Sequence, residues 1–139
     1  MPRVSGILET CLYVADMARA HAFYADVIGL EHIHADGDRI SVYEVRPEQV
    51  LILFLQGGTL APVETPGGSI PPHDGSGPTH MAFLVDGDDI AGWRAHLEAK
   101  GVGIESEVAW PKGGRSLYFR DPDEHVLELA TPPLWSRLR

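Results

Sequence analysis

The chain has 139 residues, of which 44% are hydrophobic, and its formal net charge at pH 7 is −9. This length fits one domain or two small modules, and the hydrophobic fraction suffices for a packed interior, which excludes a disordered chain. The negative charge would repel phosphate backbones and anionic lipid surfaces. We therefore expect neither a nucleic-acid nor a membrane partner.

The sequence holds one cysteine, Cys11. An intrachain disulfide is thereby excluded, and such cysteine usage suits a reducing cytosol. No apolar run reaches the roughly 20 residues that a membrane-spanning helix needs. The first residues also lack the apolar segment of a secretory signal, so we expect a cytoplasmic protein.

The first half of the chain predicts a strand, a helix and three further strands. A strand-like run over 7–14 precedes Asp16, which suits a helix N-cap. Apolar residues at helical spacing then predict a helix over about 17–28. Strands are expected at about 31–35, 39–46 and 49–55.

The second half repeats this order of elements. A strand is expected over about 79–86, and a helix begins after Asp88 or Asp89 and ends at Gly101. Three more strands are expected at about 103–109, 115–120 and 125–131. The repetition predicts that the chain contains two copies of one structural unit.

Two offsets align the copies residue by residue. An offset of 71 (80 − 9) pairs Glu9 with His80, and an offset of 75 (118 − 43) pairs Tyr43 with Tyr118 in the closing hairpins. The second offset also pairs Pro47 with Pro122 and Leu53 with Glu128. A proline turn that recurs in register is most simply explained by duplication.

The expected fold is therefore α+β, with tandem βαβββ modules whose sheets form a cupped site. The first module covers residues 1–56 and the second covers 79–139 with its C-terminal tail. Residues 57–78 are rich in glycine and proline and form a connecting loop or lid.

Three of the expected strands carry one ionisable residue on the face opposite their apolar stripe. These residues are Glu9, His80 and Glu128. A lone buried carboxylate is costly, whereas several ligands that face one cation are stabilised by it. Carboxylate and imidazole ligands suit Mn, Fe, Co, Ni or Zn, so we predict a divalent metal site.

Three stretches carry a match that extends along almost the whole chain, from about residue 7 to 131. They are VADM, AFY and IGL between Val14 and Leu30, GPTHMAF from Gly77 to Phe83, and LYFRDPD with LEL between Leu117 and Leu129. In this order and spacing they resemble the vicinal-oxygen-chelate superfamily of glyoxalases, bleomycin-resistance proteins and extradiol dioxygenases. The resemblance implies curled mixed sheets and a homodimer.

The resemblance also implies metal ligands on the first and last strands of each module. His80 and Glu128 match the usual ligands of the second module. Glu9 stands where histidine is commonest, and Leu53 stands where some members have a fourth ligand. Two carboxylates and one imidazole are a harder ligand set than that of the oxygen-activating iron enzymes, which favours Lewis-acid chemistry.

The leading hypothesis is a glyoxalase-like metal-dependent enzyme that binds a small substrate through two neighbouring oxygens. Isomerase or lyase chemistry is the favoured type of reaction, and thiol transfer is the second choice. Glu128 and Tyr118 are the candidate catalytic residues that handle protons. The candidate substrate contacts are Tyr118, Arg115, Trp110 and Ser116.

The alternative hypothesis is a metal-free protein that sequesters an aromatic antibiotic or metabolite. Its candidate contacts are Tyr13, Tyr43, Trp110 and Tyr118. Simpler interpretations also stand beside each candidate. Glu9 and Glu128 suit a solvated strand face or a structural ion pair, and His80 suits a cap at the entrance of its strand. Tyr118 and Trp110 suit packing, Arg115 suits a solvated surface, and Cys11 suits a small buried residue.

Overall fold

The computed structural model describes residues 1–135. The chain divides into two compact units, Met1–Ser76 and Gly77–Arg139. The connecting segment that was expected to stand between the modules therefore belongs almost entirely to the first unit. Among the described residues, every helix is too short or too polar to cross a membrane.

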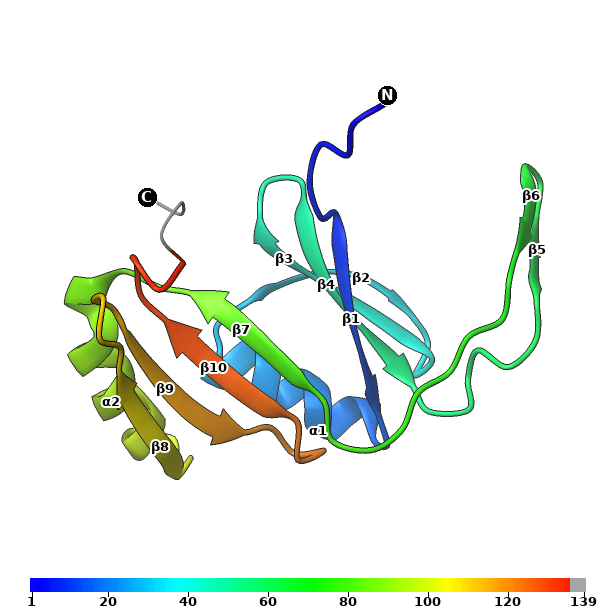
Figure 1. Cartoon of the computed structure of the whole chain (residues 1–139). Coiled ribbons are helices and arrows are strands. Elements are labelled where there is room, and N and C mark those ends of the chain that lie inside the picture. The colour runs from blue at the N-terminus through cyan, green and yellow to red at the C-terminus, as the bar shows by residue number, and fades with distance from the viewer. Residues whose placement is uncertain (136–139) are drawn as a thin grey trace. The chain divides into compact units, whose positions relative to one another are not determined.

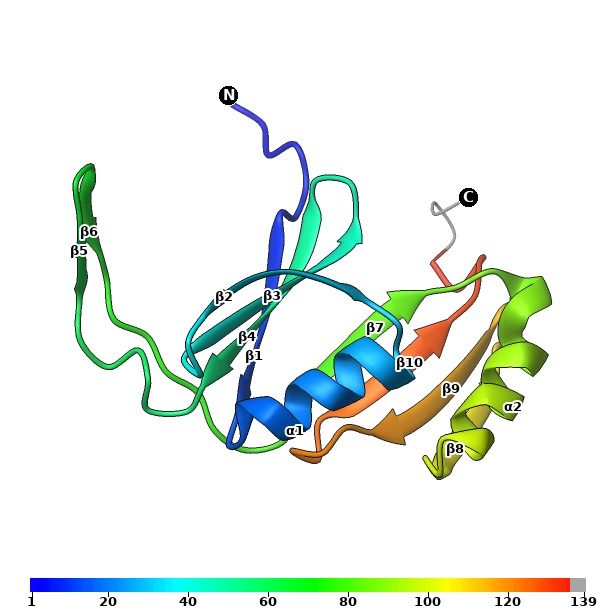
Figure 2. The same ribbon diagram turned by 180° about the vertical axis from the view of Figure 1, so that it is seen from behind.

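The first unit contains a four-stranded mixed sheet and one helical segment (Figures 1 and 2). The strands are β1 (Glu9–Val14), β2 (Glu31–Asp36), β3 (Ile40–Arg46) and β4 (Gln49–Leu55), in the spatial order β1-β4-β3-β2. β1 and β4 are parallel, and the other neighbours are antiparallel. The bounds agree closely with those expected from the sequence.

The helix α1 (Met17–Ala22) continues as a π-helical turn over Phe23–Val27. Asp16 caps α1, because its side chain accepts a hydrogen bond from the backbone N–H of Arg19 at 3.1 Å. The helix packs against β3 and β4. The core between them is formed by Leu12, Val14, Ala20, Tyr24, Tyr43, Leu51 and Leu53, all buried.

The second unit repeats this arrangement. Its strands are β7 (His80–Leu84), β8 (Ile104–Ala109), β9 (Arg115–Arg120) and β10 (Val126–Ala130), in the order β7-β10-β9-β8. A 3₁₀ turn over Gly87–Asp89 leads into α2 (Ile90–Ala99), which packs against β8. The core side chains are Leu97, Leu117, Phe119, Leu127 and Leu129. The predicted duplicated α+β fold with curled mixed sheets is confirmed.

The pairing of strands corrects one of the predicted offsets. Glu9 pairs with Val50, and its counterpart His80 pairs with Val126. Val50 and Val126 are therefore equivalent, at an offset of 76 (126 − 50) rather than 75. A shift of one residue moves a side chain to the other face of a sheet. The counterpart of Glu128 is consequently Ile52, and the pairing with Leu53 was wrong.

The same correction separates the two tyrosines that the sequence aligned. Tyr118 corresponds to Val42, because these residues pair with Glu128 and Ile52 respectively. Tyr43 instead faces α1, is fully buried and is hydrogen-bonded to His21 Nδ1 at 2.7 Å. Tyr43 is therefore a core residue, and its predicted role as a ligand contact in the alternative hypothesis was wrong.

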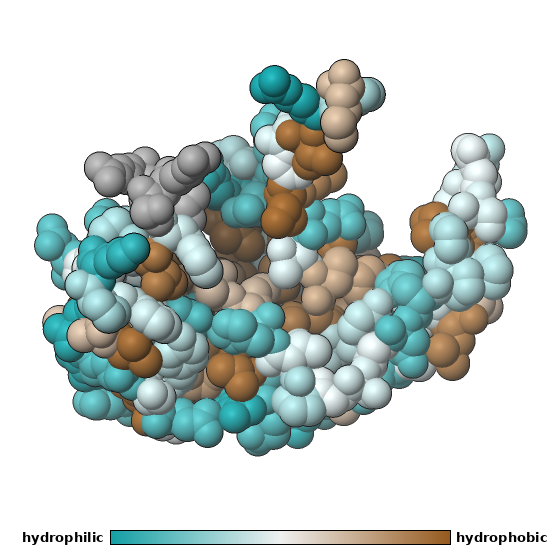
Figure 3. Space-filling view, in the orientation of Figure 1, coloured by the Kyte–Doolittle hydropathy of each residue, from teal (hydrophilic) through white to brown (hydrophobic). Residues whose placement is uncertain are grey.

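The glycine- and proline-rich segment contains a hairpin that the sequence did not predict. Its strands are β5 (Val63–Thr65) and β6 (Gly68–Ile70), and it extends away from the first sheet (Figure 1). Figure 3 shows hydrophobic surface on this part of the chain. Ile70 of β6 and Leu60, which precedes β5, are both exposed. Beyond the hairpin, His73 Nδ1 is hydrogen-bonded to the Tyr13 hydroxyl at 2.5 Å, which ties the segment back to β1.

Candidate metal site and its pocket

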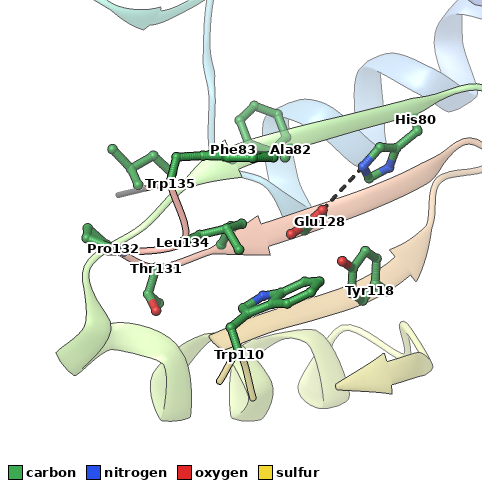
Figure 4. A pocket seen from close by; sticks show the side chains of 12 residues that line it. His80, Ala82, Phe83, Trp110, Tyr118, Glu128, Thr131, Pro132, Leu134 and Trp135 are labelled. Carbon is green, nitrogen blue, oxygen red and sulfur yellow. Dashed lines mark ion pairs between the residues drawn. The ribbon is translucent and has the colours of Figure 1, made fainter. Parts of the chain in front are cut away.

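Two of the three predicted metal ligands come together on the second sheet. β7 and β10 are parallel neighbours, and alternation puts His80 and Glu128 on the face that points away from α2. We call this side the open face of the sheet. His80 Nε2 lies 3.2 Å from Glu128 Oε1 (Figure 4).

The other ring nitrogen of His80 is held by the backbone. Nδ1 lies 2.9 Å from the carbonyl oxygen of Val126, and because a carbonyl oxygen only accepts, Nδ1 carries the proton and donates it. Nε2 therefore presents either a lone pair or a second proton to Glu128. A histidine ligand whose other nitrogen donates to a carbonyl is the usual arrangement in metal sites.

The carboxylate of Glu128 is buried and oriented by a chain of hydrogen bonds. Its Oε2 accepts from the Ser116 hydroxyl at 2.6 Å, and the Ser116 oxygen accepts from Trp110 Nε1 at 2.8 Å. Glu128 is only 5% exposed, and Ser116 is fully buried. Oε2 is satisfied by this chain, which leaves Oε1 directed at His80.

The donor set fits a divalent ion. With a proton on Nε2 the two side chains form an ion pair, whereas a lone pair on Nε2 and the carboxylate oxygen Oε1 repel each other unless a cation lies near both. Two adjacent ligands, each about 2.1 Å from one ion, lie roughly 3 Å apart. The observed 3.2 Å between these atoms agrees with that spacing.

Tyr118 is beside this pair. It is the cross-strand partner of Glu128 on β9, and its ring is 6.2 Å from the His80 ring, centroid to centroid. Burial, followed by the negative charge of Glu128, raises the pKa of the Tyr118 phenol. Tyr118 therefore stays protonated at neutral pH and can donate a hydrogen bond.

The pair lies in a pocket of about 610 Å³ formed entirely by the second unit (Figure 4). Most of the lining is apolar, and part of it comes from the C-terminal tail at Pro132, Leu134 and Trp135. Trp110 forms one wall, while its indole nitrogen remains bonded to Ser116. Trp110 and Tyr118 were predicted from the sequence, whereas the tail was not, because its residues follow no strand or helix periodicity.

The remaining predicted contacts lie elsewhere. Arg115 is not part of the pocket lining, and its guanidinium forms an ion pair with Glu107 at 2.7 Å. Ser116 is on the open face, but its hydroxyl donates to Glu128. The hypothesis that either residue contacts a substrate remains a prediction.

Glu9 belongs to the first unit, where it is exposed on the open face of the first sheet. Cys11 lies on the same face and is exposed rather than buried. Partial desolvation, followed by the charge of Glu9, raises the pKa of the Cys11 thiol, which therefore stays protonated. Within residues 1–135, no three His, Cys, Asp or Glu side chains are grouped so as to hold a metal ion.

The fold and the site define a class of protein. The family model described as "Glyoxalase/Bleomycin resistance protein/Dioxygenase superfamily" matches residues 6–129. The chain belongs to this superfamily, which confirms the resemblance noted in the sequence.

Several members of the superfamily are similar to this chain over part or nearly all of its length. The crystal structure of lactoylglutathione lyase from Agrobacterium tumefaciens is 32% identical and covers 96% of this chain and 98% of its own, with a TM-score of 0.87. Fosfomycin resistance protein FosX of Listeria monocytogenes is 26% identical over 98% of this chain and 96% of its own length. Glutathione transferase FosA of Serratia marcescens is 40% identical, but over 50% of this chain and 47% of its own.

A crystal structure of mutant FosX from Listeria monocytogenes contains Mn(II) and 1S,2S-dihydroxypropylphosphonic acid. It superposes with a TM-score of 0.71 at 22% identity and covers 99% of this chain and 98% of its own. At this identity, the likeness establishes the shared fold.

Proposed function

We propose that the chain is a glyoxalase-like, metal-dependent enzyme that acts on a small substrate bound through two neighbouring oxygens. The observation that carries this proposal is the pair of His80 Nε2 and Glu128 Oε1, 3.2 Å apart in a pocket. The names of the relatives support isomerase or lyase chemistry, through lactoylglutathione lyase, and thiol transfer, through glutathione transferase FosA.

His80 and Glu128 would hold the ion, and Glu9 is proposed as a third protein ligand. Mn, Ni, Co, Fe and Zn all suit one imidazole and two carboxylates. When bound, such an ion supplies Lewis-acid polarisation of the substrate oxygens. The Mn(II) complex of FosX supports a divalent metal in this fold.

The residues around the pair would prepare it for this role. The Val126 carbonyl fixes the tautomer of His80, and Ser116 fixes the carboxylate of Glu128. The protonated Tyr118 hydroxyl would donate to a substrate oxygen, and Glu128 would accept a substrate proton. Burial of Glu128 and Ser116 strengthens the hydrogen bond between them because little water competes with it.

Metal binding tests the proposal. Metal-free, dialysed protein is titrated with Mn²⁺, Ni²⁺ and Zn²⁺ by calorimetry, and we expect one ion per chain. His80→Ala abolishes this binding, whereas the control His96→Ala, on α2, retains it. A protein that refuses all three ions contradicts the proposal.

The role of Glu9 is tested separately, because it lies in the other unit. We expect Glu9→Gln to weaken Mn²⁺ binding, because the substitution removes one anionic ligand. Glu31→Gln, at an exposed position of β2, serves as the matched control. Equal affinities in the two variants would show that Glu9 is not a ligand.

A metal-free binding protein is the second candidate, because the pocket lining is mostly apolar and includes Trp110 and Trp135. His80→Ala separates the two functions. Loss of metal together with activity supports the enzyme, whereas unchanged binding of an aromatic ligand supports the sequestering protein.

We also propose that the protein forms a homodimer, as the family resemblance implies. Light scattering coupled to size-exclusion chromatography measures the mass directly. The dimer predicts twice the 15.2 kDa of the chain, and the mass of a single chain would contradict it.

A further inference from the structure

Among residues 1–135, no lysine or arginine lines the pocket beside the proposed metal pair. Glu128 contributes a buried negative charge to this lining. The two proposed carboxylate ligands would balance the charge of a bound divalent ion. A substrate group with its own negative charge would therefore be desolvated against the described lining without a cationic side chain to compensate. The lining therefore opposes an anionic substituent.

The arginines of the neighbouring strand do not supply the missing charge. Arg115 is paired with Glu107 at 2.7 Å, and Arg120 is paired with Glu105 at 2.8 Å. Both carboxylates belong to β8, and their pKa values are lowered by hydrogen bonds from arginine. The positive charges of β9 are thus compensated by β8 at the surface of the sheet.

Apolar and aromatic side chains provide the complementary attraction. The indole of Trp110 is held in place by its hydrogen bond to Ser116 and forms a flat wall beside Glu128 (Figure 4). Leu134 and Trp135 belong to the same lining, and Trp135 remains 69% exposed. A planar apolar group of the substrate that packs against this wall would bury its own apolar surface and that of the Trp110 indole.

We propose, resting on the function proposed above, that the substrate carries an uncharged planar apolar group next to its two chelating oxygens. Trp110 is the specificity-determining residue that receives this group. Phosphonates such as fosfomycin are therefore poor ligands of this chain, although proteins named for fosfomycin resistance are among its relatives.

Two probes that differ only in the proposed group test this inference. Benzohydroxamate and acetohydroxamate both chelate through two neighbouring oxygens, and they carry a phenyl and a methyl group respectively. Each is titrated into the Mn²⁺-loaded full chain, with free Mn²⁺ as the reference. Burial of the phenyl ring predicts that benzohydroxamate binds at least about tenfold tighter than acetohydroxamate, and also tighter than fosfomycin.

Three variants assign the preference to the pocket. Trp110→Ala reduces the ratio of the two hydroxamate affinities to near one, whereas Trp93→Ala, on α2 and outside the lining, leaves it unchanged. Leu84→Arg places a cation at an exposed position of the lining, so folding is preserved, and it raises the affinity for fosfomycin.

The outcomes separate the two proposals. A protein that binds Mn²⁺ but takes both hydroxamates equally, or prefers fosfomycin, overturns this inference and leaves the proposed function standing. A protein that refuses Mn²⁺ overturns both. A hydroxamate preference that survives Trp110→Ala contradicts the role assigned to Trp110.

Discussion

The open faces of the two sheets share one backbone arrangement but carry different chemistry. In the second sheet His80 and Glu128 face each other, and Ser116 supports the carboxylate. At the corresponding positions the first sheet has Glu9, Ile52 and Ile40. One copy of the duplicated unit thus has a single candidate ligand, Glu9, and the other has two, His80 and Glu128.

The difference shows that a ligand position requires more than a suitable strand register. Glu128 is tolerated in a buried position because Ser116 donates to one oxygen and His80 lies beside the other. Ile40 offers no hydrogen bond to a carboxylate at position 52. The substitutions below break or sharpen this comparison, beginning with the largest expected effect.

Ile52→Glu places the carboxylate of the second copy into the first. Because Ile52 is buried and its neighbour Ile40 is apolar, we expect the free energy of unfolding to fall by about 3 kcal/mol. Urea denaturation measures this loss, and Ile52→Val, which costs roughly 1 kcal/mol, is the control. Unchanged stability would show that a carboxylate needs no prepared partners on this face.

Ser116→Ala removes the donor that orients Glu128 and the acceptor of the Trp110 indole. We expect about a tenfold loss of Mn²⁺ affinity, as for other residues that orient metal ligands. Ser41→Ala deletes a buried hydroxyl from β3 of the first copy and is the matched control. Calorimetric titration distinguishes them, and equal Mn²⁺ affinities would argue that Ser116 has only a packing role. Ser116→Thr should restore much of the affinity.

Tyr43→Phe and Tyr118→Phe separate a core tyrosine from a site tyrosine. Tyr43→Phe loses the hydrogen bond to His21 and should lower the free energy of unfolding by about 1 kcal/mol without affecting ligand binding. Tyr118→Phe should leave stability nearly unchanged and weaken binding of benzohydroxamate. Thermal unfolding measures the stability of both variants, and calorimetry measures their binding of benzohydroxamate. A loss of binding in Tyr43→Phe together with a loss of stability in Tyr118→Phe would refute the corrected register.

Glu107→Gln has the smallest expected effect. Hydrogen bonding from Arg94, followed by the charges of Arg94 and Arg115, lowers the pKa of Glu107. The stabilisation is therefore present above the ordinary pKa of a glutamate and is lost as the pH falls through the lowered value. The melting temperature of the variant should be slightly lower than that of the wild type at pH 7, and this difference should disappear in acid. Glu98→Gln, on α2, controls for charge alone, and a constant difference would contradict the ion-pair origin.

The sequence predicted the order of the elements within both modules. It also placed His80 and Glu128 on the face opposite the apolar stripe, because alternation along β7 and β10 is a local property of the chain. The register between the copies was harder to predict. Pro47 and Pro122 both lie in the closing turns, but they occupy successive rather than equivalent positions. Only the pairing of Val50 with Glu9 and of Val126 with His80 reveals the difference of one residue.

The hydrogen bonds that orient Glu128 could not be predicted either, because they too depend on how the strands pair. Ser116 reaches Glu128 through the neighbouring strand, and Trp110 reaches Ser116 from the turn after β8. These contacts depend on how the strands pair and how the turn folds. The pocket tail at Leu134 and Trp135 lies outside any periodic element, so its place in the lining emerged only from the structure.

The most direct test of the central claim is pulsed electron paramagnetic resonance of the Mn²⁺-loaded protein. We predict modulation from a single histidine nitrogen, which disappears in His80→Ala, and Mn²⁺ affinity that falls by more than about 100-fold in Glu128→Gln. Nitrogen modulation that persists without His80, or full affinity without the Glu128 carboxylate, would contradict the account.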